Sequence, residues 1–357
     1  MPDSNWPPCP SSARRSWDRP SAGPSRRRRY LGRQRRCRGA NDGRGRRSPG
    51  VTSYQVGRRT VRITHPERVL FPDDGLTKAD LADYHQAVAD VLVPHLADRP
   101  LMLQRFPEGI GASGFYQKEA GRGVPGWVRT VEARKEGGVV RHPVVDDAAA
   151  LLALTNLSTV SFHRWPSRSD QLDRPDVLIV DLDPSTDDFE EVKQAARWAR
   201  ELLDELDLAS YLQVTGSRGI HVVTPLDRSA DTDAVARFAE GLARLLAARH
   251  SAELTVETRK ASRGRRLYVD VARNGWAQTA VAPYSVRPRP GAPVATPITW
   301  DELEAPGLRP DGWTIATLAE RVASHGDPWR DMARHARSLP ARGERLDALL
   351  AGEVGEQ

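Results

Sequence analysis

Apolar residues between positions 51 and 335 follow two spacings, one typical of helices and the other typical of buried strands. Thr77 and Asp80 have the spacing of a capping box, and apolar side chains follow at helical intervals from Leu81 onward. The same pattern predicts helices near residues 146–157, 189–206 and 232–248. We therefore expect at least four amphipathic or buried helices in this part of the chain.

The strongest strand signal is the aliphatic run from Val177 to Asp183, which ends at Pro184. Further strands are predicted near residues 159–162, 220–224, 254–256 and 266–271, and residues 211–219 are predicted to form a strand and a glycine turn. Because strands and helices alternate, the pattern predicts a mixed α/β fold. We expect one domain at residues 51–335, in which residues 282–335 pack on the core, and a C-terminal tail at residues 336–357.

Residues 1–50 have a different composition, rich in Arg, Pro, Ser and Gly, and we predict a disordered leader there. They contain 14 Arg and 3 Asp and therefore carry a charge of +11. Because the whole chain carries +6, residues 51–357 carry −5. The basic character of the whole chain is therefore no evidence that its folded part binds nucleic acid. An alternative is that translation starts near Val51. Both cysteines, Cys9 and Cys37, lie in this leader.

Several classes of protein are disfavoured by what the sequence lacks. No apolar run approaches the ~20 residues of a membrane helix and no secretory signal is evident, so we expect a cytoplasmic protein with no membrane partner. The chain has no G-x-S-x-G elbow, no His-Glu-x-x-His helix and no paired cysteine ligands. Acyl transfer and zinc hydrolysis thus have no supporting motif.

Three aspartates are candidates for metal chemistry. Asp181 and Asp183 are two apart on a predicted strand, so both carboxylates face one side while Leu182 faces the other. Such a pair suits Mg²⁺ or Mn²⁺, although solvated carboxylates at a strand exit are the more common explanation of this motif when it is taken alone. Asp270 lies in a second strand and needs a partner, either a shared metal or an arginine such as Arg265 or Arg266.

A glycine-rich turn, Thr215–His221, lies between these acids and leads into a strand. Its backbone N–H groups can form an anion-binding nest, to which Ser217, Arg218 and His221 can add donors for phosphate oxygens. The turn lacks the ending and the following helix of a Walker loop. A plain hairpin and a structural histidine remain alternatives.

Five separated segments resemble, in order and spacing, the polymerase domain of bacterial ligase D, in the archaeo-eukaryotic primase superfamily. They are Phe162–Trp165, Val180–Pro184, Thr215–His221, Tyr268–Asp270 followed by Asn274, and Thr279–Arg287. The likeness runs from about Val51 to His335. It implies a primase-polymerase fold with central, mostly antiparallel sheets flanked by helices.

The resemblance implies roles for the acidic residues and for the residues around the turn. Asp181, Asp183 and Asp270 match the acids that ligate two divalent cations, Mn²⁺ or Mg²⁺. The residues that match positions around the incoming nucleotide are His163, Thr215, His221 and Arg287, and a 2′-OH would be read by a polar group such as Thr215 or His163.

A second set of matching residues is basic. Arg105 and Gln117–Lys118 match family positions that are mostly basic and lie near the active site. Arg68 and Lys78 match a pair that grips a 5′-phosphate at a DNA break. Without the family, all of these residues would most often be solvated surface.

By resemblance, we expect a template-directed nucleotidyltransferase that adds NTPs or dNTPs to a primer 3′-OH at gaps or broken DNA ends. A catalytically silent module that binds 5′-phosphorylated ends and a metal-dependent nuclease are the alternatives. The expected partners are a Ku-type end binder and a separate ATP-dependent DNA ligase, since the chain has no adenylation motif and no room for a ligase domain after His335. The expected location is the bacterial cytoplasm, at the nucleoid.

Overall fold

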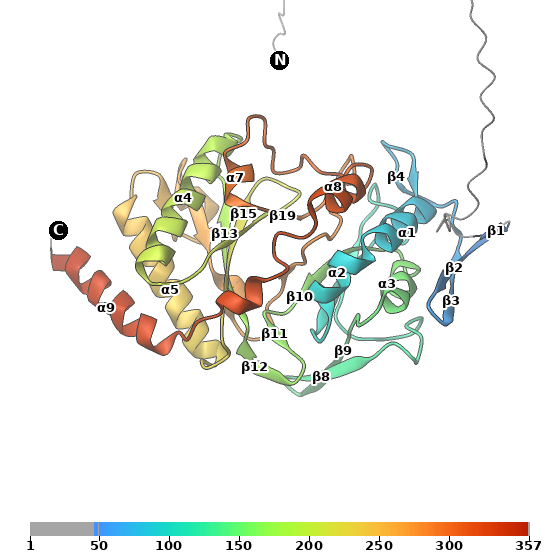
Figure 1. Ribbon diagram of the computed structural model, residues 1–357, viewed down its shortest axis with the longest axis horizontal. Helices are drawn as coiled ribbons and strands as arrows, with labels where there is room; N and C mark the ends of the chain where they lie inside the picture. The colour runs from blue at the N-terminus through green and yellow to red at the C-terminus, as the bar shows by residue number, and fades with distance from the viewer. Residues whose placement is uncertain (1–45, 49, 356–357) are drawn as a thin grey trace, which may run out of the picture. The chain divides into compact units, whose positions relative to one another are not determined.

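The computed structural model describes residues 46–48 and 50–355 (Figure 1). The predicted leader, with Cys9 and Cys37, lies almost entirely outside the described residues. The described chain begins with a three-stranded antiparallel sheet of β1 (Arg46–Ser48), β2 (Val51–Val56) and β3 (Arg59–Thr64). No helix of the described residues is long and apolar enough to cross a membrane.

A six-stranded sheet forms the centre of one half of the fold. Its strand order is β16 (Leu254–Thr255), β17 (Leu267–Asp270), β13 (Val177–Asp183), β15 (Ile220–Pro225), β14 (Tyr211–Val214) and β19 (Thr296–Ile298). All neighbours pair antiparallel except β16 and β17. The antiparallel character implied by the resemblance is therefore confirmed.

Helices α4 (Phe189–Glu205) and α5 (Thr232–Arg249) pack against this sheet (Figure 1). Alternate residues of β13, among them Leu178, Val180 and Leu182, are buried in one hydrophobic cluster with apolar side chains of both helices. Because side chains alternate along a strand, the intervening residues of β13 face the other side of the sheet. The helix layer thus leaves one face of the sheet for the site described below.

The other half of the fold is built on a four-stranded antiparallel sheet. Its order is β18 (Ala280–Val281), β10 (Thr159–Arg164), β6 (Leu101–Arg105) and β7 (Phe115–Gln117). The helices of this half are α1 (Lys78–Ala87), α2 (Ala89–Leu96) and α3 (Ala148–Thr155), and their apolar side chains share one core with those of β6 and β10.

Local signals explain where these helices begin. Thr77 and Asp80 form the predicted capping box at the start of α1, and Asp147 caps α3. The helix predicted from Leu81 onward is not continuous, because it is interrupted at Val88, which caps both α1 and α2. Val88 is fully buried, so this break is part of the core.

The remaining elements are short or lie near the C-terminus. They are β4 (Val69–Phe71), β5 (Leu76–Thr77), β8 (Thr130–Lys135), β9 (Gly138–Pro143), β11 (Ser167–Arg168), β12 (Gln171–Pro175), α6 (Lys260–Arg263), η1 (Ala272–Asn274), α7 (Trp300–Leu303), α8 (Leu318–His325), η2 (Met332–His335) and α9 (Pro340–Gly355). Helix α9 lies within the segment that the sequence analysis set apart as a tail. It packs on α5, and its Leu346 is 2% exposed within the core.

Candidate active site

The pairing of three adjacent strands brings the predicted acids together. Asp181 on β13 lies directly opposite Asp270 on β17 and, on its other side, opposite His221 on β15. Asp183 follows two residues later on the same face, while Leu182 between them is fully buried against the helices. The predicted placement of Asp181, Asp183 and Asp270 on one face of the sheet is therefore found in the structure.

A cavity of about 470 Å³ opens over this face. It is lined by every residue that the sequence analysis assigned to metal or nucleotide binding: His163, Asp181, Asp183, Thr215, Ser217, Arg218, His221, Asp270 and Arg287. The same cavity is lined by Met102, Tyr116, Arg273 and Thr279, which the sequence analysis did not assign. Residues from both sheets thus share one pocket.

The glycine turn is held tightly against the rest of the site. Gly216 has φ +64°, and a Cβ atom there would lie 2.7 Å from Cγ of Arg287 and 2.9 Å from the carbonyl carbon of Val294. At Gly219 a Cβ atom would collide with the carbonyl oxygen of Leu182, the residue between the two aspartates. Both glycines are therefore required for the close approach of the turn to the pocket.

The hydroxyl of Thr215 closes this turn. It donates to the carbonyl oxygen of Gly219 at 3.1 Å and accepts from the Gly219 N–H at 3.3 Å. These two bonds use the hydroxyl proton and one of its two lone pairs, so one acceptor position remains. Thr215 therefore fixes the turn and, with His163, stays a candidate for reading a 2′-OH.

Basic side chains surround the three carboxylates. Arg273 lies 3.9 Å from Asp181 and 3.6 Å from Asp270, measured between guanidinium nitrogens and carboxylate oxygens. Nε2 of His221 is 3.6 Å from a carboxylate oxygen of Asp181. Asp183 has two such neighbours, with Arg263 at 3.4 Å and Arg218 at 3.6 Å. The arginines reduce the mutual repulsion of the acids.

The environment of Asp181 lowers the pKa of its carboxyl group. Burial acts in the opposite direction and raises this pKa, but the charges of His221, Arg273 and Arg287, with a hydrogen bond from His221, outweigh it. Asp181 is therefore ionised at neutral pH, as a ligand for a cation must be.

Arg273 is positioned by a neighbour that the sequence analysis named only in a motif. The side chain of Asn274 is fully buried, accepts from the N–H of Ile179 at 2.8 Å and donates to its carbonyl oxygen at 2.7 Å. These bonds attach η1 to β13 and hold Arg273 beside the acids. The alternative that a nearby arginine pairs with Asp270 is confirmed, but that arginine is Arg273. The two examples named from the sequence do not pair with it, since Arg265 approaches Glu191 and Arg266 donates to backbone carbonyls.

The donor set of the pocket fits hard divalent cations, because all three acids offer carboxylate oxygens. Among the described residues, however, no three His, Cys, Asp or Glu side chains converge closely enough to enclose an ion. The arginines described above lie beside the same carboxylates. Binding of a cation by all three acids therefore requires small side-chain rotations and displacement of these arginines.

His163 contributes a neutral imidazole to the pocket. Burial, together with the charges of Arg287, Arg273 and His221, lowers the pKa of His163 to about 3. Its Nε2 atom has no hydrogen-bond partner among the described residues, and its ring lies 5.6 Å from that of Tyr116, which is 56% exposed. A buried nitrogen without a partner beside a cavity is suited to a ligand.

The remaining predicted residues do not line this pocket; three of them lie close enough together to interact. Nζ of Lys78 donates to the carbonyl oxygen of Thr64 at 2.9 Å, and burial with the charges of Arg68 and Arg105 lowers the pKa of Lys78 to about 8. Arg105 donates to Gln117 at 2.6 Å, and Lys118 is exposed. We refer to Arg68, Lys78 and Arg105 as the basic cluster.

Known proteins resemble this chain over most of its described part. The family model described as the LigD primase-polymerase domain matches residues 77–329. The multifunctional non-homologous end joining protein LigD of Pseudomonas aeruginosa is 33% identical over 298 residues, which are 81% of this chain and 35% of the relative. The bifunctional non-homologous end joining protein LigD of Bacillus subtilis is 30% identical over 282 residues, which are 78% of this chain and 45% of the relative.

A solved structure is similar as well. The polymerase domain of Mycobacterium tuberculosis ligase D, in complex with DNA, superposes with a TM-score of 0.73 at 29% identity and covers 78% of this chain and 99% of that one. Polymerase domains of this kind are in general metal-dependent. The chain spans less than half the length of the curated relatives that it matches.

The low pKa of His163 makes a prediction for acid stability. The unfolded chain binds a proton at this histidine near pH 6.5, whereas the folded chain does so only near pH 3. The free energy of unfolding should therefore fall, as the pH is lowered through this window, by up to about 1.4 kcal/mol per pH unit from this group. We expect His163→Gln to remove this contribution, which corresponds to about one bound proton, from the pH dependence of the unfolding free energy. Urea unfolding at pH 4, 5 and 6 measures it. His65→Gln, at an exposed position, serves as the control, and an unchanged slope in His163→Gln would contradict the neutral assignment.

Proposed function

The chain belongs to the family of LigD primase-polymerase domains and is a nucleotidyltransferase, and from this premise we propose that it adds nucleotides to the 3′-OH of a primer on a DNA template. The proposed substrates are ribo- or deoxyribonucleoside triphosphates and the ends or gaps of broken DNA. The observation that carries the proposal is the convergence of Asp181, Asp183 and Asp270 with His163, His221 and Arg287 around one cavity.

We assign the binding of two Mn²⁺ or Mg²⁺ ions to Asp181, Asp183 and Asp270. Bound cations would supply the positive charge that activates the primer hydroxyl and stabilises the departing pyrophosphate. Asp181 and Asp270 lie opposite one another on paired strands, so they are the acids best placed to share an ion. Arg273 then turns away from them, which makes its guanidinium available to a phosphate oxygen.

The nucleotide is held by groups on three sides of the cavity. Arg287 and Arg218 offer guanidinium donors to the triphosphate, and the backbone amides of Ser217 and Arg218 add neutral ones, since those of Gly216 and Gly219 already bond within the protein. His221 faces the phosphates from β15, next to Asp181. His163 offers its free Nε2 on the opposite side, where Tyr116 presents an exposed aromatic face for stacking.

The basic cluster is assigned to the 5′-phosphate on the far side of a gap. Arg68 and Lys78 are joined by their backbones, since the Lys78 N–H donates to the Arg68 carbonyl oxygen at 2.8 Å. This bond holds the two cationic residues close together, Arg68 just before β4 and Lys78 at the start of α1. Lys118, exposed at the end of β7, extends the positive surface toward DNA.

The biological setting follows from the relatives. They are named as proteins of non-homologous end joining, and the M. tuberculosis polymerase domain was solved with DNA. We propose that this chain acts at double-strand breaks in the bacterial cytoplasm, at the nucleoid. The proposed partners are a Ku-type end-binding protein and an ATP-dependent DNA ligase on a separate polypeptide.

The proposed acid set predicts which variants lose activity. Asp181→Ala, Asp183→Ala and Asp270→Ala should each lower primer extension on gapped DNA by about 100-fold or more with Mn²⁺ or Mg²⁺, because each removes a cation ligand. EDTA should abolish extension by the unaltered chain. Asp170→Ala, which removes an exposed acid away from the pocket, is the matched control. Extension that persists in the Asp181 and Asp270 variants would exclude this centre.

The same assay separates the two alternative functions. Shortening of the primer in place of extension would indicate a nuclease. Binding of the gapped DNA without any addition, under all metal conditions, would indicate a module that only recognises DNA ends.

The basic cluster predicts a pH-dependent preference for 5′-phosphorylated gaps. Because the pKa of Lys78 is about 8, its ammonium group is charged at pH 7 and mostly neutral at pH 9. The ratio of binding to phosphorylated and unphosphorylated gaps should be about tenfold at pH 7 and should decline toward pH 9. Lys78→Ala should remove the preference at both pH values, whereas Lys135→Ala, at an exposed lysine on β8, should keep it. An unaltered preference in Lys78→Ala would assign the phosphate to another site.

A further inference from the structure

A second cavity, of about 800 Å³, is lined by residues of the same strand that contributes His163 to the candidate active site. His163 lines the candidate active site, whereas Arg164, the next residue of β10, lines the second cavity. Successive side chains of a strand point to opposite faces, so the two cavities lie on opposite sides of β10. The second cavity is lined in part by apolar side chains, among them Pro94 and Trp329.

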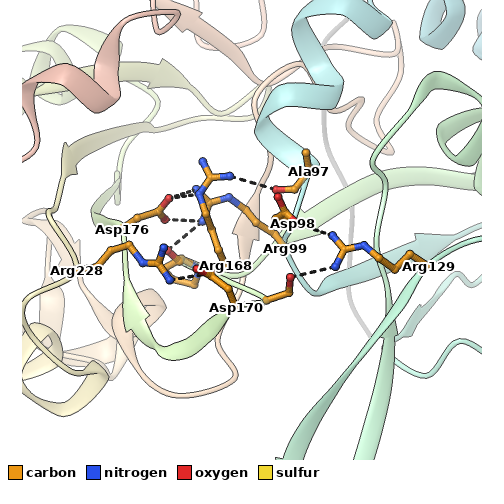
Figure 2. Close-up of polar contacts among 10 residues, drawn as sticks. Ala97, Asp98, Arg99, Arg129, Arg168, Asp170, Asp176 and Arg228 are labelled. Atoms are coloured by element: carbon orange, nitrogen blue, oxygen red, sulfur yellow. Dashed lines mark hydrogen bonds and ion pairs between the residues drawn. The ribbon is translucent and has the colours of Figure 1, made fainter.

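Five arginines line the second cavity, and we refer to its lining as the wall. Asp176, a carboxylate of this wall, already accepts hydrogen bonds from two of them. Arg99 donates to both carboxylate oxygens of Asp176, at 2.6 and 2.7 Å, and Arg168 donates to one of them at 2.7 Å (Figure 2). Arg228, also on the wall, pairs with Asp170 at 2.8 Å. Asp176 therefore balances Arg99 and Arg168 only in part.

A second acid on the wall is also engaged. The carboxylate of Asp327 accepts from the Tyr284 hydroxyl at 2.7 Å and from the Trp329 N–H at 3.0 Å, and it contacts His95 at 2.8 Å. Burial lowers the pKa of His95, although its bond to Asp327 acts in the opposite direction. The wall carries five arginines and four aspartates, and a fifth aspartate, Asp170, pairs with Arg228 from just outside it, so the charges balance in number but not in position.

Arg164 differs from Arg99, Arg168 and Arg228, which all pair with aspartates. Its side chain is 4% exposed, and its guanidinium has one hydrogen bond, from Nη1 to the carbonyl oxygen of His95 at 3.2 Å. Among the described residues, no carboxylate lies within the 4.0 Å of an ion pair with it. Burial, together with the charges of Arg99 and Arg168, lowers the pKa of Arg164, and the charges of Asp176 and Asp327, which lie beyond ion-pair distance, oppose this shift only in part.

A buried cation without an anion is costly, and a guanidinium offers a fork of donors that matches an oxyanion. We propose that the second cavity binds a small oxyanion, a phosphate or carboxylate group, through Arg164. The anion pairs with the Arg164 guanidinium and takes up donors that the protein leaves free. The neighbouring Arg168, which is half-buried, is placed to contribute to the same site.

The test uses thermal unfolding of the full chain without nucleotide or DNA, so it is independent of the proposed polymerase function. Inorganic phosphate should raise the Tm of the unaltered chain by about 2–4 °C at saturation, relative to chloride at equal ionic strength. Arg164→Met keeps most of the side-chain volume and removes the charge. It should raise the Tm without phosphate and reduce the phosphate-dependent rise, and equilibrium dialysis should show one fewer bound phosphate.

A matched control distinguishes this site from a general effect of arginine. Arg228→Met changes a residue of the same wall whose charge is paired with Asp170, and it should keep the phosphate response. Acetate in place of phosphate identifies the preferred class: a rise with both anions indicates a carboxylate-tolerant site, and a rise with phosphate alone a phosphate site. Equal phosphate responses and equal stoichiometry in the unaltered chain and Arg164→Met would overturn the proposal.

A second variant covers the case in which Arg164→Met does not fold. Arg164→Lys keeps the charge but loses the planar fork, and should bind phosphate more weakly than the unaltered chain. An undiminished affinity in Arg164→Lys and an undiminished stoichiometry would equally exclude Arg164 as the anion ligand.

Discussion

The repulsion between carboxylates on neighbouring strands is the constraint on which this site depends. Asp181 and Asp270 are opposite one another in an antiparallel pair, where side chains of like charge directly across are destabilising. In the chain alone, Arg273 lies beside both carboxylates and offsets part of this repulsion. A site built in this way favours any divalent cation that can replace the arginine, because the cation supplies more charge in less space.

The rest of the fold keeps these charges in place. Leu182, between the two aspartates, is buried in the core formed with α4 and α5. The backbone of Gly219 lies so close to its carbonyl group that a larger residue would not fit. Asn274 attaches the segment that carries Arg273 to the same strand. Asp181 and Asp183 therefore lie on a strand, β13, that packs against two helices, and Asp270 and Arg273 are attached to the same strand by the pairing of β17 and by Asn274. Preorganisation of this kind is the main contribution that a protein makes to phosphoryl transfer.

Much of this arrangement could be predicted from the sequence, because it depends on local periodicity. The alternation in Val177–Asp183 predicts which side chains are buried and which face the site, and the Thr77 capping box predicts the start of α1. Residues whose roles arise only from tertiary contacts could not be predicted. Arg273 becomes a partner of Asp181 through the pairing of β13 with β17.

Other features were beyond sequence reasoning for the same physical reason. The hydroxyl of Thr215 could be expected in the site, but its bonds within the turn depend on the turn's conformation. The burial of Arg164 without a carboxylate partner is a property of the whole wall of its cavity, to which Asp176 and Asp327 contribute from distant segments. Helix α9 packs on α5 through Leu346, a contact that periodicity alone does not specify.

The most direct test of this account is a crystal structure of the chain grown with Mn²⁺ and a non-hydrolysable nucleoside triphosphate, with anomalous diffraction measured at the manganese edge. The account predicts manganese peaks within about 2.2 Å of carboxylate oxygens of Asp181, Asp183 and Asp270, and an Arg273 side chain turned away from them. Manganese bound elsewhere in the chain, or Arg273 still between Asp181 and Asp270 in the nucleotide-bound crystal, would contradict it.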